Sequence, residues 1–285
     1  MAHLVRSGQV TSVKLREGLA KTYQNDILKI SFIMAEKVTK ETNFNLDTEE
    51  MFKVGLHFGH KTSKAHPKME PYLYGARNTI HIIDLDKTKE KLEKALRFIQ
   101  QLISEKKVLL TVGTSIQMRD LVKDFATKFD FPYVSERWLG GTFTNFEVIK
   151  KRINYFKDLE EKKQGGELKK YTKKEISKIE KQLAGFERKF GGIKNLKNLP
   201  DAIFVLSMAK DTLVIKEAKT KNIKVIGISD TDADPTLADY PIPANDNAKS
   251  SIKYILERVA EVIEKTKQET KSKEKETEKK SKDEA

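Results

Sequence analysis

The chain has 285 residues, no cysteine and a formal net charge of +13, with 55 Lys plus Arg against 42 Asp plus Glu. The lack of cysteine excludes disulfide bonds. No apolar window of about 18 residues occurs, so we expect no membrane-spanning helix. The excess of basic residues is typical of a protein that binds a polyanion.

The two ends of the chain differ from its middle. Residues 1–44 form an N-terminal extension with a loose helical pattern and without the continuous apolar stretch of a signal peptide. Met34 is an alternative start, so residues 1–33 are either translated or lie upstream of the true first residue. Residues 265–285 hold eight Lys and six acidic residues with one apolar side chain, so we expect a disordered charged tail.

Residues 45–264 alternate short apolar runs with stretches of helical periodicity, which predicts one α/β domain. Apolar runs separated by single helices indicate a mostly parallel sheet with helices on both faces. The continuous apolar character of the second and fourth runs suits strands that are buried on both sides. We expect strands at 79–84, 107–113, 132–135, 202–207 and 224–229, and helices at 48–54, 88–104, 115–129, 211–220 and 248–265.

A long charged insertion interrupts this alternation at about residues 145–192. Apolar residues recur there at spacings of three and four, which predicts two helices that bury narrow stripes against each other as an antiparallel coiled coil. Thr172 and Glu175 fit a capping box at the start of the second helix, and Gly191 and Gly192 end it. The stripe residues are Phe146, Ile149, Ile153, Phe156 and Leu159 in the first helix and Ile176, Ile179, Leu183, Phe186 and Phe190 in the second.

The segment 136–146 leads into the insertion and holds the only tryptophan, Trp138. Two roles are open for Trp138: a buried anchor beneath a turn or, with Arg137, a surface that stacks on RNA bases and contacts phosphate. We favour the buried position for Trp138 and RNA contact for Arg137. A glycine pair permits a sharp turn here, and a threonine and a glutamate fit a capping box; these residues are Gly140, Gly141, Thr144 and Glu147.

Residues 147–198 carry 16 Lys and Arg against eight Asp and Glu, so more than half of the net charge lies on the insertion and its exit. Solvated helical faces mix the two signs near balance, so this excess favours contact with phosphate groups. We expect the basic runs to bind nucleic-acid backbone; they are Lys150, Lys151 and Arg152, then Lys162 and Lys163, Lys169 and Lys170, and Lys173 and Lys174.

Three histidines, His57, His60 and His66, cluster near the front of the domain. A zinc site requires three or four ligands, and Gly59 interrupts a regular helical presentation of this set. A glycine-flexed loop that presents basic side chains to phosphate fits better, and we expect no metal. The expected RNA contacts of this loop are His60, Lys61, Lys64 and Lys68.

Two features allow an enzyme instead. Residues 113–115 read Gly-Thr-Ser at a strand-to-helix turn, where free N–H groups hold a phosphate. Asp230, Asp232 and Asp234 follow the last strand, where carboxylates bind Mg²⁺ or form turns before proline. Neither a dinucleotide-binding nor a P-loop motif is present. A cytosolic nucleotide- or sugar-phosphate-binding α/β enzyme is therefore the alternative reading.

The chain also carries a series of specific motifs: GLHFGH at 55–60, HPKM at 66–69, RN at 77–78, RWLGGT at 137–142, GGIK at 191–194, LPDA at 199–202 and DYPIP at 239–243. On these motifs, over about residues 50–260, it resembles the bacterial small-subunit ribosomal protein S-two family. The resemblance implies a Rossmann-like or flavodoxin-like sheet with a protruding coiled coil. It also implies binding of small-subunit ribosomal RNA and of neighbouring ribosomal proteins, including ribosomal protein S-one where an organism has it.

Two segments depart from the family pattern. Ala244 stands where the family usually has a glycine. Residues 207–211 read Ser-Met-Ala-Lys-Asp where the family has an Asp-Pro-Arg-Lys-like turn, which removes one arginine. The matching residue Arg77 joins the expected RNA contacts. We therefore expect a cytoplasmic, ribosome-bound structural constituent of the small subunit that supports translation, with no enzymatic activity and no cofactor.

Overall fold

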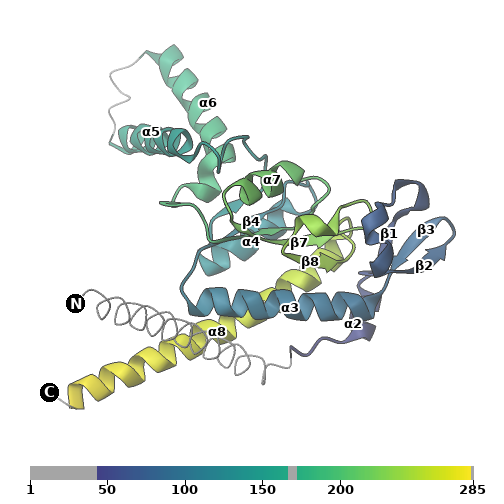
Figure 1. Ribbon diagram of the computed structural model, residues 1–285. Helices are drawn as coiled ribbons and strands as arrows, with labels where there is room; N and C mark the ends of the chain where they lie inside the picture. Colours follow the sequence, from purple (N-terminus) through teal and green to yellow (C-terminus); the bar gives the residue numbers. More distant parts are fainter. Residues whose placement is uncertain (1–43, 166–171, 284–285) are drawn as a thin grey trace, which may run out of the picture. The chain divides into compact units, whose positions relative to one another are not determined.

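The computed structural model (Figure 1) describes residues 44–165 and 172–283. The chain divides into two compact units, Met1–Asn45 and Leu46–Ala285, and all described helices and strands belong to the second. Residues 1–43, with the alternative start at Met34, and the predicted contacts Lys169 and Lys170 lie outside the described residues. Over the described ranges, no helix combines the length and the apolar character needed to cross a bilayer.

Five parallel strands form the centre of the second unit. Neighbouring strands run in the same direction, because the chain crosses back over one face of the sheet between one strand and the next. The sheet has the order β5-β4-β6-β7-β8, which in chain order is 2-1-3-4-5, the order of flavodoxin-like doubly wound sheets. The predicted parallel α/β sheet is therefore confirmed. Its strands are β4 (Leu109–Val112), β5 (Tyr133–Val134), β6 (Ala202–Val205), β7 (Lys224–Ser229) and β8 (Tyr240–Pro243).

Helices cover both faces of this sheet (Figure 1). On one face, α7 (Thr212–Thr220) buries Val214 and Ile215 against alternate residues of β4 and β6. On the other, α3 (Leu85–Ser104) packs against α8 (Lys249–Asp283), and α4 (Arg119–Phe129) also contacts α8. All four residues of β4 and of β6 are buried, as the continuous apolar runs predicted.

Two helix starts differ from the prediction. Helix α3 begins at Leu85, three residues early, because the Asp84 carboxylate accepts a hydrogen bond from the N–H of Asp86 at 3.0 Å and caps the first turn. Helix α4 begins at Arg119 and not at residue 115, because Met118 N–H donates to the Ser115 carbonyl in a separate turn. The short helix α2 (Thr48–Lys53) lies where expected, with Asp47 as its cap.

One predicted strand belongs to a different sheet. Residues 80–83 form β3 (Ile80–Ile83), the central strand of a three-stranded antiparallel sheet of order β1-β3-β2, with β1 (Phe58–Lys61) and β2 (Leu73–Arg77). The predicted glycine-flexed loop around His60 is thus a strand, followed by the 3₁₀ turns Thr62–Lys64 and Pro67–Tyr72. The fifth parallel strand is β8, which the sequence analysis did not predict because its two prolines argue against a strand.

The outer edges of β5 and β8, the two outer strands of the parallel sheet, differ in what limits further strand pairing. Beyond β5, the backbone of the 3₁₀ turn Gly191–Ile193 lies so close to the Tyr133 carbonyl that a Cβ at Gly192 would collide with it. At the opposite side, β8 contains Pro241 and Pro243, which carry no backbone N–H. Glycine is therefore required at position 192 by close packing of two chain segments.

The insertion forms the helices α5 (Phe146–Gln164) and α6 (Lys173–Phe190). The ring of Phe186 contacts the rings of Tyr155 and Phe156, each at a centroid distance of 6.0 Å. Ile153, Leu183 and other residues of the predicted stripes are buried and belong to the same core cluster as α7 and β4. The capping box at Thr172 and Glu175 is present.

Helix α8 continues to Asp283, well past the predicted helix end at residue 265, and so differs from the predicted disordered tail. The extension has a packing reason near its start. Thr266 is buried, and the Lys267 ammonium donates to the Phe129 carbonyl at 3.0 Å. Beyond these contacts the alternating Lys and Glu residues have high intrinsic helix propensity.

Candidate nucleic-acid interface

The turn before α5 is held by one buried carboxylate. Trp138 is 7% exposed, and its indole packs edge-on against Phe143 at 4.8 Å. Glu217 of α7 accepts hydrogen bonds from the Trp138 indole N–H at 3.4 Å, from Gly141 N–H at 2.7 Å and from Phe143 N–H at 3.0 Å. The buried alternative for Trp138 is therefore correct, and the turn is fixed to α7. Arg137 is exposed beside it.

The capping box predicted at Thr144 and Glu147 is not formed. Asn145 occupies the cap position without a side-chain hydrogen bond, and its own N–H donates to the Gly141 carbonyl at 2.8 Å. The chain enters α5 through this preceding turn, so no threonine cap is needed. Gly141 has a φ of +89°, which favours glycine, whereas Gly140 has no such conformation.

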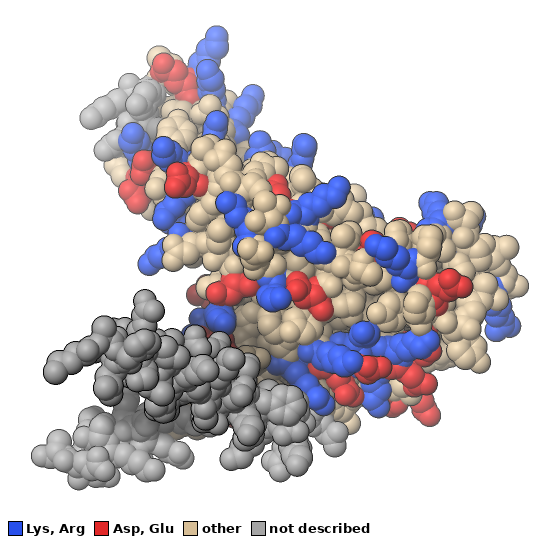
Figure 2. All heavy atoms as spheres, viewed as in Figure 1, with Lys and Arg blue, Asp and Glu red and all other residues tan. Residues whose placement is uncertain are grey.

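The basic runs of α5 and α6 face solvent. Lys150, Lys151 and Arg152 are exposed on α5, on the sides of the helix away from the buried Ile153 and Phe156. Lys173 and Lys174 are exposed in the first turn of α6. Lys and Arg side chains project from both helices on the face shown in Figure 2. Within the described part of the chain, none of these five side chains forms an ion pair with an acidic residue.

Two of the expected contacts near the front of the domain are engaged elsewhere. His60 lies 3.2 Å from Asp230 and 3.8 Å from Asp232, and the contact with Asp230 raises the pKa of His60 to about 8, against the opposing effect of burial. The Lys68 ammonium donates to Asp234 at 2.7 Å. Burial alone would raise the pKa of Asp234, but hydrogen bonds from Lys68 and Thr236 lower it to about 2. Three others, Lys61, Lys64 and Arg77, are exposed on the antiparallel sheet and its following turn.

The remaining histidines have structural partners. His57 is buried, stacks on Phe52 at 4.3 Å, and has its pKa lowered by burial. His66 accepts a hydrogen bond from Lys68 N–H and caps a 3₁₀ turn. Among the residues that the structure describes, no group of three or more His, Cys, Asp or Glu side chains is placed to hold a metal ion.

The carboxyl edge of the parallel sheet, where α/β enzymes bind ligands, is occupied by the chain's own side chains. Between β4 and β6, the point at which the strand order reverses, the Thr114 hydroxyl donates to Asp211 at 2.8 Å, and burial raises the pKa of Asp211. Ser207, at the departure from the family pattern, donates to the buried Asp246 at 2.5 Å. A Cβ at Gly113 would press on Val122 at 2.9 Å, so this glycine serves helix packing.

The fold and these surfaces together define a basic α/β protein that carries runs of exposed lysines on an insertion and fills the carboxyl edge of its sheet with its own side chains. The family described as ribosomal protein S2 matches residues 51–266. The small ribosomal subunit protein uS2 of Hahella chejuensis (strain KCTC 2396) is 42% identical over 212 residues, which cover 74% of this chain and 84% of that protein. The chain belongs to the ribosomal protein S2 family, and it is a structural, non-enzymatic protein of the small ribosomal subunit.

Sequence reasoning missed Glu217, the residue that fixes the turn before α5. One signal was available: Glu217 lies on the same helical face as the buried Val214 and Ala218, so its charge interrupts an apolar stripe. A buried carboxylate needs several hydrogen-bond donors, but the sequence does not reveal that these lie 74 to 79 residues earlier.

Proposed function

We propose that α5 and α6 form an antiparallel coiled-coil arm that binds the phosphate backbone of small-subunit ribosomal RNA. The observation that carries this proposal is the row of exposed cations on α5, at Lys150, Lys151 and Arg152, without acidic partners among the described residues. Unpaired cations on a solvated helix release condensed counterions when they neutralise phosphates, which favours association. Lys173 and Lys174 of α6 extend the same basic surface.

The packing of α5 on α6 supports the coiled coil. Phe186 of α6 contacts both Tyr155 and Phe156 of α5, so apolar side chains from the predicted stripes join the two helices. At 1.5 Å per residue, helices of 19 and 18 residues span about 27–29 Å. An arm of that length reaches RNA phosphates beyond the body that carries it.

The body contributes further contacts in this proposal. Arg137, at the base of the arm, and Lys61, Lys64 and Arg77, on the antiparallel sheet, are exposed cations that extend the RNA surface. Exposed apolar side chains on all three strands of the antiparallel sheet, Phe58, Tyr74 and Ile80, suit protein neighbours, among them ribosomal protein S-one where an organism has it. His60 and Lys68 already have carboxylate partners, so RNA contact at these two residues would compete with those ion pairs.

Charge reversal tests the arm. We expect the triple variant Lys150→Glu, Lys151→Glu and Arg152→Glu to fold with unchanged cooperativity but to lose at least about tenfold of its incorporation into small subunits, because each reversal replaces a phosphate contact by repulsion. Tagged protein is followed through sucrose gradients at low Mg²⁺, where small subunits sediment separately.

The matched control reverses Lys123, Lys216 and Lys221, three exposed lysines of α4, α7 and the turn that follows α7, with the same change in net charge. Incorporation of the control should stay within about twofold of wild type. Equal incorporation of the two triple variants would contradict the proposal. Mass spectrometry of the native N-terminus separately decides between translation from Met1 and from Met34.

A further inference from the structure

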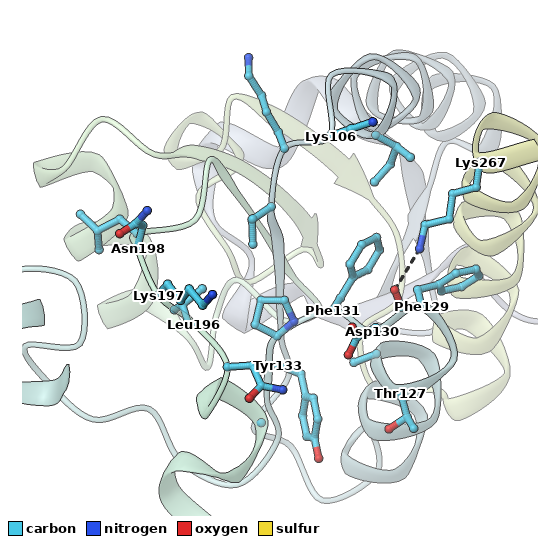
Figure 3. A pocket seen from close by; sticks show the side chains of 18 of the residues that line it. Lys106, Thr127, Phe129, Asp130, Phe131, Tyr133, Leu196, Lys197, Asn198 and Lys267 are labelled. Carbon is cyan, nitrogen blue, oxygen red and sulfur yellow. Dashed lines mark hydrogen bonds between the residues drawn. The ribbon is translucent and has the colours of Figure 1, made fainter. Parts of the chain in front are cut away.

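A pocket of about 880 Å³ opens at the amino edge of the parallel sheet, opposite the edge at which α/β enzymes bind ligands (Figure 3). Residues that precede β4 and β5 form one side of it, including Val108 and Phe131. The segment from Gly191 to Leu199, which follows α6, and Lys267 of α8 complete the lining. Its volume lies in the ~300–1,000 Å³ range of small-ligand sites.

The walls are aromatic and already fixed in place. Phe131 and Tyr133 contribute rings, and Leu196 contributes an aliphatic side chain (Figure 3). The Lys267 ammonium donates to the Phe129 carbonyl at 3.0 Å and lies 4.9 Å from the centre of the Phe131 ring. Close packing of Gly192 on the Tyr133 carbonyl holds the opposite wall. A ligand therefore meets a preformed surface and loses little affinity to ordering.

The charge of the lining is strongly basic. Four lysines, Lys106, Lys107, Lys197 and Lys267, line the pocket, whereas Asp130 is its one acidic residue. Lys107 also pairs with Glu105 at 2.5 Å, outside the lining, so the exposed Lys197 is the cation on which a phosphate contact is argued. The amides of Asn195 and Asn198 add neutral donors and acceptors at the same side as Lys197. Aromatic rings beside cations and amides are the set that binds an unstacked nucleotide: the rings stack on the base, the cations neutralise the phosphate and the amides meet the base edge.

We infer that this pocket takes the base of one unpaired nucleotide of RNA, stacked on Phe131 or Tyr133, with its phosphate beside Lys197. The inference rests on the proposed function, because it requires that the arm binds RNA. Gly191 and Gly192, at which α6 ends, line the pocket, so a strand that follows the basic arm toward the body reaches it. The site thereby adds recognition of a single-stranded nucleotide to backbone binding by the arm.

A peptide fits the pocket less well. Extended peptides bind to sheets by adding a strand at a free edge. The nearest edge is β5, and the turn Gly191–Ile193 already covers it. The exposed ammonium of Lys197 would also repel basic segments of a protein neighbour.

Photo-crosslinking of the full chain tests the inference. The probe is hexauridylate with one 4-thiouridine, and the comparison probe is a blunt RNA duplex that contains the same thiouridine in a base pair. After irradiation, digestion and mass spectrometry, we expect adducts on Phe131 or Tyr133 with the single strand and at least about fivefold fewer with the duplex.

Two variants and a matched control complete the test. Lys197→Glu should lower the yield of pocket adducts about tenfold, whereas Lys216→Glu, the same charge change on α7, should lower it less than twofold. Phe131→Leu keeps apolar volume but removes the ring, and we expect a loss of about tenfold; if it fails to fold, Lys197→Glu decides. Three outcomes would refute the nucleotide site in the pocket while leaving the proposed function standing. They are adducts confined to the arm, equal adduct yields with the single strand and the duplex, and equal losses for Lys197→Glu and Lys216→Glu. Failure of wild type to bind either probe, together with normal incorporation of the α5 triple variant into subunits, overturns the proposed function as well.

Discussion

At the scale of single residues, Glu217 determines where the insertion leaves the body. Its carboxylate accepts three N–H donors from the turn that holds Trp138, and it is itself buried on α7. Such a carboxylate is stable in the interior only while all of its donors are present. The direction in which α5 begins thus depends on one side chain that lies more than 70 residues away in sequence.

Substitution of Glu217 should release this turn. We expect Glu217→Ala to lower the free energy of unfolding by about 2–4 kcal/mol, because it leaves buried N–H groups without acceptors. Trp138 is the only tryptophan, so its fluorescence emission in the folded variant should shift to longer wavelength as water gains access. The control Lys216→Ala, on the exposed side of the same helix, should change stability by less than about 0.5 kcal/mol. Unchanged emission and stability in Glu217→Ala would refute this account of the turn.

At the scale of elements, a polar cluster joins the antiparallel sheet to the parallel one. His60 of β1 pairs with Asp230 and Asp232, which follow β7, and its N–H donates to the Thr231 hydroxyl at 2.8 Å. Gly59 is required beside it, because a Cβ would collide with the Thr231 side chain. Burial, followed by the charge of Asp230, raises the pKa of the nearby Asp246. The imidazolium therefore offsets several neighbouring carboxylates.

The ion pairs of His60 with Asp230 and Asp232 predict that the stability of the fold depends on pH. Because the pKa of His60 is raised from 6.5 to about 8 in the folded protein, its stabilisation is complete below pH 6.5 and is lost as pH rises through 8. His60→Gln should therefore lower the free energy of unfolding by about 1–2 kcal/mol at about pH 6 and by much less at about pH 9. Urea denaturation at both pH values measures this difference. A deficit of the same size at both would mean that His60 acts through packing and not through charge.

The elements that local sequence patterns specify well were predicted, and those that depend on distant partners were not. Continuous apolar runs located β4, β6 and β7, and the three-and-four spacing located α5 and α6. The two prolines of β8 argue against a strand in the sequence, but the fold tolerates them because β8 is an outer strand. Which strand is outermost cannot be read from local sequence. The residues around β3 carry an apolar run like that of a parallel strand, so the run alone did not reveal an antiparallel sheet.

The same distinction applies to the interface. Exposed lysines on helices follow from their position relative to an apolar stripe, so the basic surface of α5 could be located from spacing. The ion pairs of His60 and Lys68 join residues about 170 positions apart, which no local pattern discloses. Both residues were therefore expected to face phosphate from a glycine-flexed loop, although the structure pairs them with carboxylates.

At the scale of the whole molecule, the net charge is concentrated on one insertion, and this should determine the salt dependence of RNA binding. The logarithm of the association constant with small-subunit ribosomal RNA should fall linearly with the logarithm of salt concentration. Replacement of Lys150, Lys151 and Arg152 by alanine should reduce the magnitude of that slope by about 2–3, since each phosphate contact contributes about 0.7–0.9. Filter binding between about 50 and 300 mM KCl measures the slope. Alanine at Lys123, Lys216 and Lys221 should leave it within about 1 of wild type, and equal slopes for the two variants would exclude the arm as the main contact.

The outer edges of β5 and β8 matter most before the protein has assembled with RNA. An outer strand with free N–H and C=O groups is a template on which a second copy can pair and start a growing aggregate. Here the turn Gly191–Ile193 covers the outer edge of β5, and Pro241 and Pro243 remove backbone N–H donors from the outer edge of β8. Both edges of the parallel sheet therefore offer a second copy few groups with which to extend the sheet, before assembly as well as after it.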